Sequence, residues 1–160
     1  MWLEAWLAGR PPRNVWLGTT AEDEARARQR IPILLEIPAA VRFVSHEPAL
    51  ESVDFRQYTH GLDWIITGGE SGPGARPYHP EWAERVIEQC RDAGIAPFVK
   101  QMGAHVLGSM RDGAPHYFWP VGTDFGTYRD AYPPRVKLKN KKGGNPAEWP
   151  ECVRVREFPS

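Results

Sequence analysis

Polar and charged side chains follow each of four short apolar runs in this sequence, at the points where the runs end. With the glycine-rich stretch after the third run, they are our candidate ligand-binding residues: Thr20, Glu22, Ser45, His46, Glu47, Gly68, Gly69, Glu70, Ser71, Arg76, Lys100 and Gln101. A carboxylate and a lysine that share a cleft shift each other's pKa, so Lys100 beside Glu47 or Glu70 would suit acid–base chemistry. The same side chains could equally form a charged network that only stabilises the structure, and both interpretations stay open.

The stretch from residue 68 to residue 76 reads Gly-Gly-Glu-Ser-Gly-Pro-Gly-Ala-Arg and is the most unusual in the chain. Four glycines and a proline allow a backbone to approach a ligand closely and to expose its N–H groups. The stretch lacks the Gly-Lys-Ser/Thr of a Walker A loop, and the next predicted helix begins too late for a dinucleotide fingerprint. It is either a tight structural turn or a ligand-binding loop, with Glu70 as an acceptor and Arg76 as an anion partner.

The remaining reactive residue types predict no metal site. Cys90 and Cys152 are the two cysteines of the chain, and neither lies in a Cys-x-x-Cys pair. No His or Cys stands at ligand spacing from His46, which we expect to make ordinary hydrogen bonds. The sequence has no Gly-x-Ser-x-Gly elbow, so nothing supports a serine hydrolase. We therefore assign no catalytic residue.

The elements that must position these residues alternate along the chain. The apolar runs 14–20, 41–45, 62–67 and 97–99 predict strands, with helices at 21–30 and from residue 79 onward. We expect Thr20 to cap the first of these helices and Pro32 to end or kink it. Apolar strands joined by helical crossovers predict a parallel sheet covered by helices, with the carboxyl ends of its strands at one edge.

The predicted fold class is therefore α/β: a partial (β/α) barrel or an open parallel sheet of about four strands, with covering helices and an irregular C-terminal extension. We assign residues 1–104 to half-barrel βα units and residues 105–160 to an aromatic and basic extension that packs on the same domain. We expect a short hairpin near residues 152–155. Two groups of aromatic residues are predicted to be buried: Trp16, Trp64 and Trp82 in the core, and Phe118, Trp119, Phe125, Tyr128 and Trp149 under the extension.

Charge and hydropathy indicate the environment of the protein but do not identify a binding partner. The chain of 160 residues carries 20 basic and 20 acidic residues, so its net charge names no partner. A basic run without a nearby acid predicts either a solvated loop or contact with phosphate or nucleic acid: Arg135, Lys137, Lys139, Lys141 and Lys142. No run reaches membrane-spanning length and the N-terminal residues do not resemble a signal peptide. We expect a cytoplasmic protein with free thiols and no membrane contact.

Several blocks of the sequence follow one another in the order seen in a known family. They are Asn14-Val15-Trp16-Leu17-Gly18, Arg42-Phe43-Val44-Ser45-His46-Glu47-Pro48, the stretch 68–77, Lys100-Gln101-x-Gly103, and the tail from Lys142 to Pro159. On these residues the chain resembles the phage gp-thirty-seven/gp-sixty-eight family of unknown function along nearly its whole length. Fuller members of that family resemble radical SAM proteins. The resemblance thus implies a barrel with a [4Fe–4S] cluster held by three cysteines and S-adenosylmethionine bound at the free iron.

The chain departs from that family in one respect, because the cysteine-rich N-terminal region is absent. The resemblance therefore covers the C-terminal half only, as expected for a truncated product, an internal-start fragment or one half of a split protein. No cofactor is expected in this chain alone, and we do not expect it to be active as an enzyme unless an N-terminal half completes it. Half a barrel would leave two sheet edges unpaired and one face uncovered, so we expect self-association or docking onto the missing half.

Three functional hypotheses follow. In the first, the chain is half of a radical-SAM-like barrel whose rim binds S-adenosylmethionine or a polar substrate through Glu47, Glu70, Lys100 and Gln101. The alternative is a non-catalytic module that binds a small polar or phosphorylated ligand or a protein partner. A weaker alternative is a nucleic-acid-binding accessory protein that uses the basic run.

Overall fold

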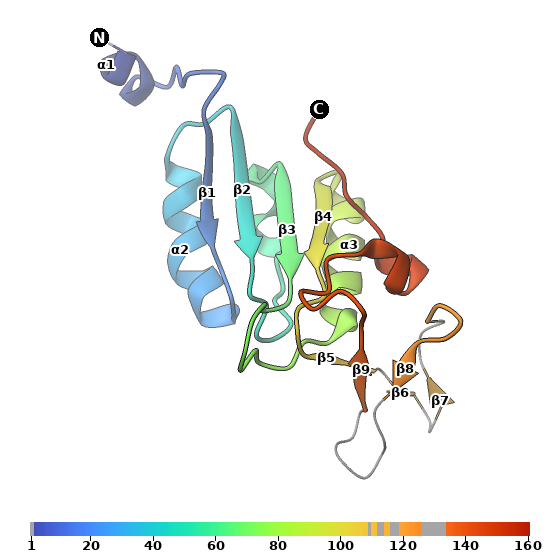
Figure 1. The fold of residues 1–160 in the computed structure, drawn as a ribbon. Helices are drawn as coiled ribbons and strands as arrows, with labels where there is room; N and C mark the ends of the chain where they lie inside the picture. Colours follow the sequence, from blue (N-terminus) through green and yellow to red (C-terminus); the bar gives the residue numbers. More distant parts are fainter. Residues whose placement is uncertain (1, 109, 112–113, 116–118, 126–133) are drawn as a thin grey trace.

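Four parallel strands form the centre of the molecule. The computed structural model describes residues 2–108, 110–111, 114–115, 119–125 and 134–160. Within this part, β1 (Trp16–Thr20), β2 (Val41–His46), β3 (Trp64–Gly68) and β4 (Ala96–Gln101) form one sheet in the order β1-β2-β3-β4 (Figure 1). Each strand thus lies beside the next strand in the sequence. The structure confirms the α/β class, and the sheet is open.

Two long helices and a short one cover a single face of this sheet. The helices α2 (Glu24–Glu36) and α3 (Pro80–Ala93) lie behind the strands in Figure 1, and η1 (Arg56–Gly61), a 3₁₀ helix, connects β2 to β3. The buried core lies between these elements and the sheet, and its side chains come from all of them: Ala27, Ile31 and Leu34 of α2, Val44 and Ile65 of the sheet, Phe55, Tyr58 and Leu62 around η1, and Val86 and Cys90 of α3. The apolar side chains of this face of the sheet are buried against the helices, and the hydrophobic effect favours this burial.

The start of α2 differs from the sequence prediction, and the structure rules out one of the two alternatives for Pro32. The helix begins three residues later than expected, because Asp23 is its cap and accepts a hydrogen bond from Arg26 N at 2.8 Å. Thr20 instead accepts a hydrogen bond from Arg30 Nη1 at 2.7 Å. The helix also runs through Pro32 to Glu36, so the proline does not end it. In α3, Pro80 in the first turn and Gly94 as a left-handed cap follow the expected pattern.

The opposite face of the sheet carries aromatic side chains rather than a second layer of helices. The ring centroid of Trp64 lies 5.3 to 5.8 Å from those of Trp16, Phe43, Phe98 and Phe158. Trp16 is 43% exposed and Phe158 is 63% exposed. The prediction of a core position was therefore wrong for Trp16. Alternate residues of a strand face opposite sides of the sheet, and Trp16 lies on the side that the helices do not cover. We call these five residues the aromatic face.

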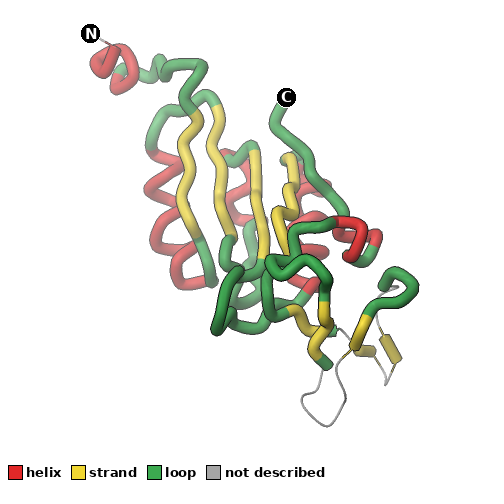
Figure 2. Tube along the Cα trace, viewed as in Figure 1, coloured by secondary structure: helices red, strands yellow, loops and turns green. Residues whose placement is uncertain are grey.

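The C-terminal tail runs antiparallel along β4 (Figure 2). Val99 N donates to Val155 O at 2.8 Å and Glu157 N donates to Pro97 O at 2.9 Å. The expected hairpin near residues 152–155 is absent, because a 3₁₀ turn, η3 (Glu151–Val153), precedes this pairing. The tail therefore pairs an edge of the sheet that we had expected to be unpaired.

Short elements complete the described part of the chain. They are α1 (Trp2–Leu7), η2 (Pro146–Glu148), a small antiparallel sheet of β5 (Val106–Leu107), β9 (Arg135–Lys137) and β8 (Asp124–Phe125), and a two-stranded pair of β6 (Met110–Arg111) and β7 (Ala114–Pro115). A second buried cluster joins α3 and β4 to this region through Trp149, Val136 and Val153, with Trp82 and Trp119 packed against it. Phe118 and Tyr128 lie outside the described residues. No helix in the described ranges is long and apolar enough to cross a membrane.

Candidate functional site

The carboxyl ends of the four strands, with the loops that leave them, form a continuous rim. Backbone hydrogen bonds of 2.8 to 3.0 Å connect neighbouring loops: Leu50 N to Glu22 O, Ala49 N to Gly68 O, Gly69 N to Gln101 O, and Ala104 N to Glu70 O. A loop whose backbone is bonded to its neighbours keeps its side chains in a defined place. The rim is therefore preformed, and the candidate residues lie on it or directly beside it, with His46 buried beneath it.

Glu47 and Lys100 form the ion pair that bridges the rim between β2 and β4. Lys100 Nζ lies 2.9 Å from Glu47 Oε2, although 53 residues separate them in the sequence. Lys100 lies near the carboxyl end of β4, at the point where the pairing of β4 with β3 shifts by one residue. The lysine side chain is 56% exposed and the glutamate 13% exposed. The sequence left Glu47 and Glu70 as alternative partners of Lys100, and the structure places Lys100 beside Glu47.

Glu70 and Arg76 form a second pair, which closes the glycine-rich loop upon itself. The Arg76 guanidinium donates to both oxygens of Glu70 at 2.9 Å, and Arg76 N donates to Glu70 Oε2 at the same distance. The guanidinium hydrogen bonds lower the pKa of Glu70 to about 2. Both side chains that we had considered as ligand groups thus bind each other, and Lys100 pairs with Glu47 rather than with Glu70.

Glu22 forms a third pair with Arg30 of α2, at 3.1 Å. Burial opposes ionisation of Glu22, but hydrogen bonds from its own backbone and from Thr20, together with the charge of Arg30, lower its pKa overall. A cleft of about 320 Å³ separates this pair from the glycine-rich loop and is lined on the far side by Arg76. The three candidate carboxylates therefore have three different cationic partners along one rim.

His46 lies on the helix side of the sheet and is fully buried. Its Nε2 lies 3.1 Å from Glu51 O, which can only accept, so Nε2 carries the proton. Its Nδ1 then accepts from the Thr67 hydroxyl at 3.2 Å. Burial lowers the pKa of this imidazole to about 4, and its ring packs edge-on against Phe55. We expected ordinary hydrogen bonds for His46, and the structure shows them, but away from the open face.

The glycines of the loop serve two different purposes. A Cβ on Gly69 would meet Met102 O at 2.2 Å, and one on Gly103 would meet Glu70 O at 2.7 Å. Gly68 is less tightly packed, since its Cβ would lie 3.0 Å from Gln101 O, and the Gln101 side-chain amide donates to Gly69 O at 2.9 Å. These positions need glycine because another backbone, not a ligand, approaches them. Gly72 has a φ of 100° and open space around it, as a turn requires.

The last two candidates are Ser45 and Ser71, which lie in different parts of the structure. Ser45 follows Phe43 by two residues on β2 and is half-buried, and its carbonyl accepts a hydrogen bond from Ala21 N at 3.0 Å. Ser71 is exposed in the glycine-rich loop and lines a cavity shared with the C-terminal region. The structure thus separates the candidates of the aromatic face from those of the loop.

Tyr78 was not among the predicted site residues. It is fully buried beside Gly69 and packs edge-on against Trp82. Burial raises the pKa of its phenol, and an interaction with the Thr67 hydroxyl partly opposes this effect. No sequence pattern marks Tyr78 as a site residue, because it lies in the short link between the glycine-rich loop and the cap of α3.

The chain does not fit an iron–sulfur cluster. Cys90 is buried in the core, and burial raises its pKa to about 12. Cys152 is exposed at η3, and its pKa is also raised, chiefly by desolvation. A cluster needs several thiolates, and neither environment favours even one. The described residues contain no group of three or more His, Cys, Asp or Glu side chains that could hold a metal ion.

Comparison with known proteins assigns a family without an activity. A family model described as a protein of unknown function (DUF5131) matches residues 3–149. Searches of curated proteins and of solved structures gave no match.

Proposed function

The chain belongs to the DUF5131 family of proteins of unknown function, and we propose that it binds a small polar ligand on the rim of a radical-SAM-like half-barrel. The observation that carries this proposal is the Glu47–Lys100 pair, which joins the carboxyl ends of β2 and β4. In parallel α/β proteins, ligands bind at that end of the sheet.

Lys100 is the member of the pair that a ligand can reach directly, because its side chain is 56% exposed, whereas Glu47 is 13% exposed. The carboxylate of a zwitterion would bind Lys100, and its ammonium group would bind Glu47. The other two carboxylates of the rim are less available, because Glu70 is held by two hydrogen bonds from the Arg76 guanidinium and Glu22 by Arg30.

S-adenosylmethionine is the zwitterion that we propose as the ligand. Its amino-acid end carries the two charges that Glu47 and Lys100 complement, and its sulfonium and rings would lie over the aromatic face. This ligand also agrees with the resemblance to the phage gp-thirty-seven/gp-sixty-eight family. Any cluster would come from another polypeptide segment, since the two cysteines here do not fit one. We assign no radical step to this chain.

The test is a titration of the ¹⁵N-labelled chain with S-adenosylmethionine, followed by amide chemical shifts. We expect saturable shifts at residues 45–47, 68–70 and 100–101 and at residues of the aromatic face. Lys100→Ala should weaken the affinity about tenfold, since it removes one charge-assisted hydrogen bond. Lys139→Ala is the matched control, because Lys139 is also an exposed lysine but lies far from the rim pair in the tail. Its affinity should equal that of the unchanged chain.

Two results would oppose the proposal. One is the absence of saturable shifts at the rim, and the other is equal affinity of the Lys100→Ala variant and the unchanged chain. Anaerobic incubation with iron and sulfide separates the cluster question from ligand binding. We expect the chain to stay colourless, whereas a stable brown protein would show that it holds a cluster by itself.

A further inference from the structure

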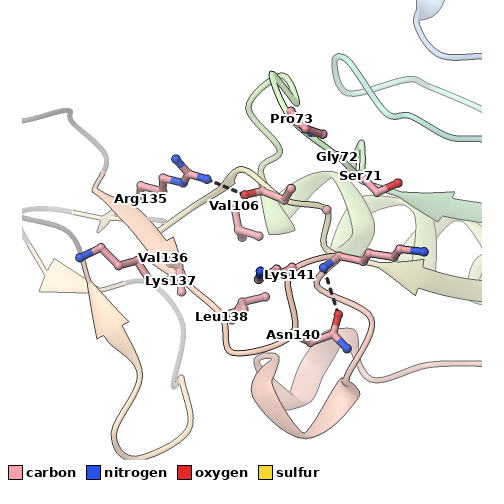
Figure 3. A pocket seen from close by; sticks show the side chains of 13 residues that line it. Ser71, Gly72, Pro73, Val106, Arg135, Val136, Lys137, Leu138, Asn140 and Lys141 are labelled. Atoms are coloured by element: carbon pink, nitrogen blue, oxygen red, sulfur yellow. Dashed lines mark hydrogen bonds between the residues drawn. The ribbon is translucent and has the colours of Figure 1, made fainter.

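A second concave site lies between the glycine-rich loop and the C-terminal region, away from the Glu47–Lys100 pair. Figure 3 shows Ser71, Gly72 and Pro73 on one side, β9 and Asn140 on the other, and Lys141 between them. The cavity has a volume of about 670 Å³, within the range of roughly 300 to 1,000 Å³ that small-molecule sites occupy. We propose that it binds a phosphorylated small molecule of nucleotide size.

The charge of the lining is the first reason. Four cationic side chains border the cavity, and the described lining contains no Asp or Glu: Arg135, Lys137, Lys141 and Lys142. Arg135 Nη2 donates to Ala104 O at 2.7 Å, and Lys137 lies 3.6 Å from Asp124 at the surface. Within the described ranges, Lys141 and Lys142 have no carboxylate partner. This imbalance of charge is what an anionic group would neutralise.

The apolar part of the lining is the second reason. Val106 and Val136 are buried partners in the small antiparallel sheet, and Leu138 and Pro73 extend the same wall. A bare phosphate would not be stabilised by this wall, because contact between apolar surface and a charged group is not favourable in free energy. A nucleotide would place its flat base against the valines and leucine and its phosphates against the lysines.

The turn that carries the two lysines is held in place before any ligand arrives. The side chain of Asn140, labelled in Figure 3, accepts hydrogen bonds from Lys142 N at 3.0 Å and from Gly144 N at 3.1 Å. Gly143 O accepts from Met102 N at 2.9 Å and so ties the turn to the exit of β4. A preorganised site loses less entropy on binding than a mobile loop would.

The cavity differs from the binding surface of an extended nucleic acid. Single-strand binding proteins combine a continuous basic groove with aromatic side chains on which successive bases stack. In this site the cations surround one bounded cavity, and its walls are aliphatic. The geometry therefore favours one nucleotide unit over a strand.

The experiment measures binding of a fluorescent N-methylanthraniloyl derivative of ATP to the intact chain by anisotropy. We expect one site per chain, with an affinity that falls as the salt concentration rises. Lys141→Ala should weaken binding about tenfold, the loss expected for one charged contact. Lys139→Ala is the matched control. Lys139 carries the same charge and lies two residues from Lys141 in the sequence, but its side chain does not line the cavity. It should bind as the unchanged chain does.

Competitors and a second variant define what would overturn the inference. ATP should displace the probe better than tripolyphosphate or adenosine, because each of these offers only half of the required contacts. Equal displacement by tripolyphosphate, tighter binding of a twelve-nucleotide single strand, or equal losses for Lys139→Ala and Lys141→Ala would each contradict it. Lys100→Ala should leave ATP binding unchanged, so failure of the rim proposal and failure of this one remain distinguishable.

Discussion

At the scale of single residues, each candidate carboxylate of the rim already has a partner inside the chain. Glu47 pairs with Lys100, Glu70 with Arg76 and Glu22 with Arg30. A carboxylate held by a guanidinium has a lowered pKa and is a weak base at neutral pH. The rim is thus better suited to charge complementarity than to proton transfer.

His46 provides a pH-dependent test of the fold at the same scale. Its folded-state pKa is about 4, and an exposed histidine titrates near 6.5. Below pH 6.5 the unfolded chain therefore binds a proton that the folded chain does not, and stability is lost as the pH falls toward 4. We expect the free energy of unfolding to fall by about 2 kcal/mol between pH 7 and pH 5 on account of this residue.

Urea unfolding of His46→Gln at both pH values measures this contribution. Over the same pH interval, the free energy of unfolding of the variant should fall by about 2 kcal/mol less than that of the unchanged chain, whatever its value at pH 7. His60 is exposed on η1, so His60→Gln should keep the full pH dependence. A His46→Gln variant with the pH dependence of the unchanged chain would contradict the assignment of a buried, neutral imidazole.

At the scale of elements, three close backbone contacts join loops that are far apart in the sequence. Gly69 approaches Met102, Gly103 approaches Glu70, and Gly143 approaches Gly103, each too closely for a Cβ. The glycine-rich loop, the exit of β4 and the C-terminal turn are therefore packed as one unit. This unit supports both the rim and the cavity.

Replacing Gly143 by alanine tests that unit. Gly143 has a φ of 64°, and its added Cβ would lie 2.5 Å from Gly103 O. We expect a loss of about 3 kcal/mol in urea unfolding, from backbone strain together with the steric conflict. Gly94→Ala is the control, because Gly94 has a φ of 70° but open space, and strain alone should cost about 1 kcal/mol. Equal losses for the two variants would show that close packing at Gly143 is unimportant.

At the scale of the whole molecule, the aromatic face is the surface without a covering layer. The tail already pairs the β4 edge and places Phe158 over Trp64, and the Trp64 indole donates to Glu157 O at 2.9 Å. Trp16, the first residue of the edge strand β1, remains 43% exposed. We propose that two copies of the chain associate through this face when no ligand occupies it, because an exposed aromatic surface gains free energy when another surface covers it.

Size-exclusion chromatography with light scattering tests this association. The unchanged chain should have a mass that rises with concentration toward that of a dimer, and Trp16→Glu should shift the equilibrium toward the monomer by at least tenfold, since a buried charge is costly. Ile33→Glu is the control, because Ile33 is 58% exposed on α2, in the opposite layer. A well-folded chain that stays monomeric at all concentrations would contradict the proposal.

The amino-acid sequence by itself determined the order of the elements, the parallel sheet and the gathering of polar residues at one rim. These features follow from local patterns, because apolar runs and helical periodicity repeat within a few residues. Parallel pairing then places the carboxyl ends of strands such as β2 and β4 together. The pairing of Glu47 with Lys100 was foreseeable for that reason, although Glu70 was an equal candidate until the structure placed Arg76 beside it.

Only the tertiary structure decided which face each side chain occupies and which loop backbones meet. His46 and Glu47 are neighbours in the sequence, but the first is buried beneath the helices and the second pairs with Lys100 at the rim. The contact of Gly143 with Gly103 and the pairing of the tail with β4 join segments 40 or more residues apart. Such contacts depend on packing of the whole chain, which no local pattern encodes.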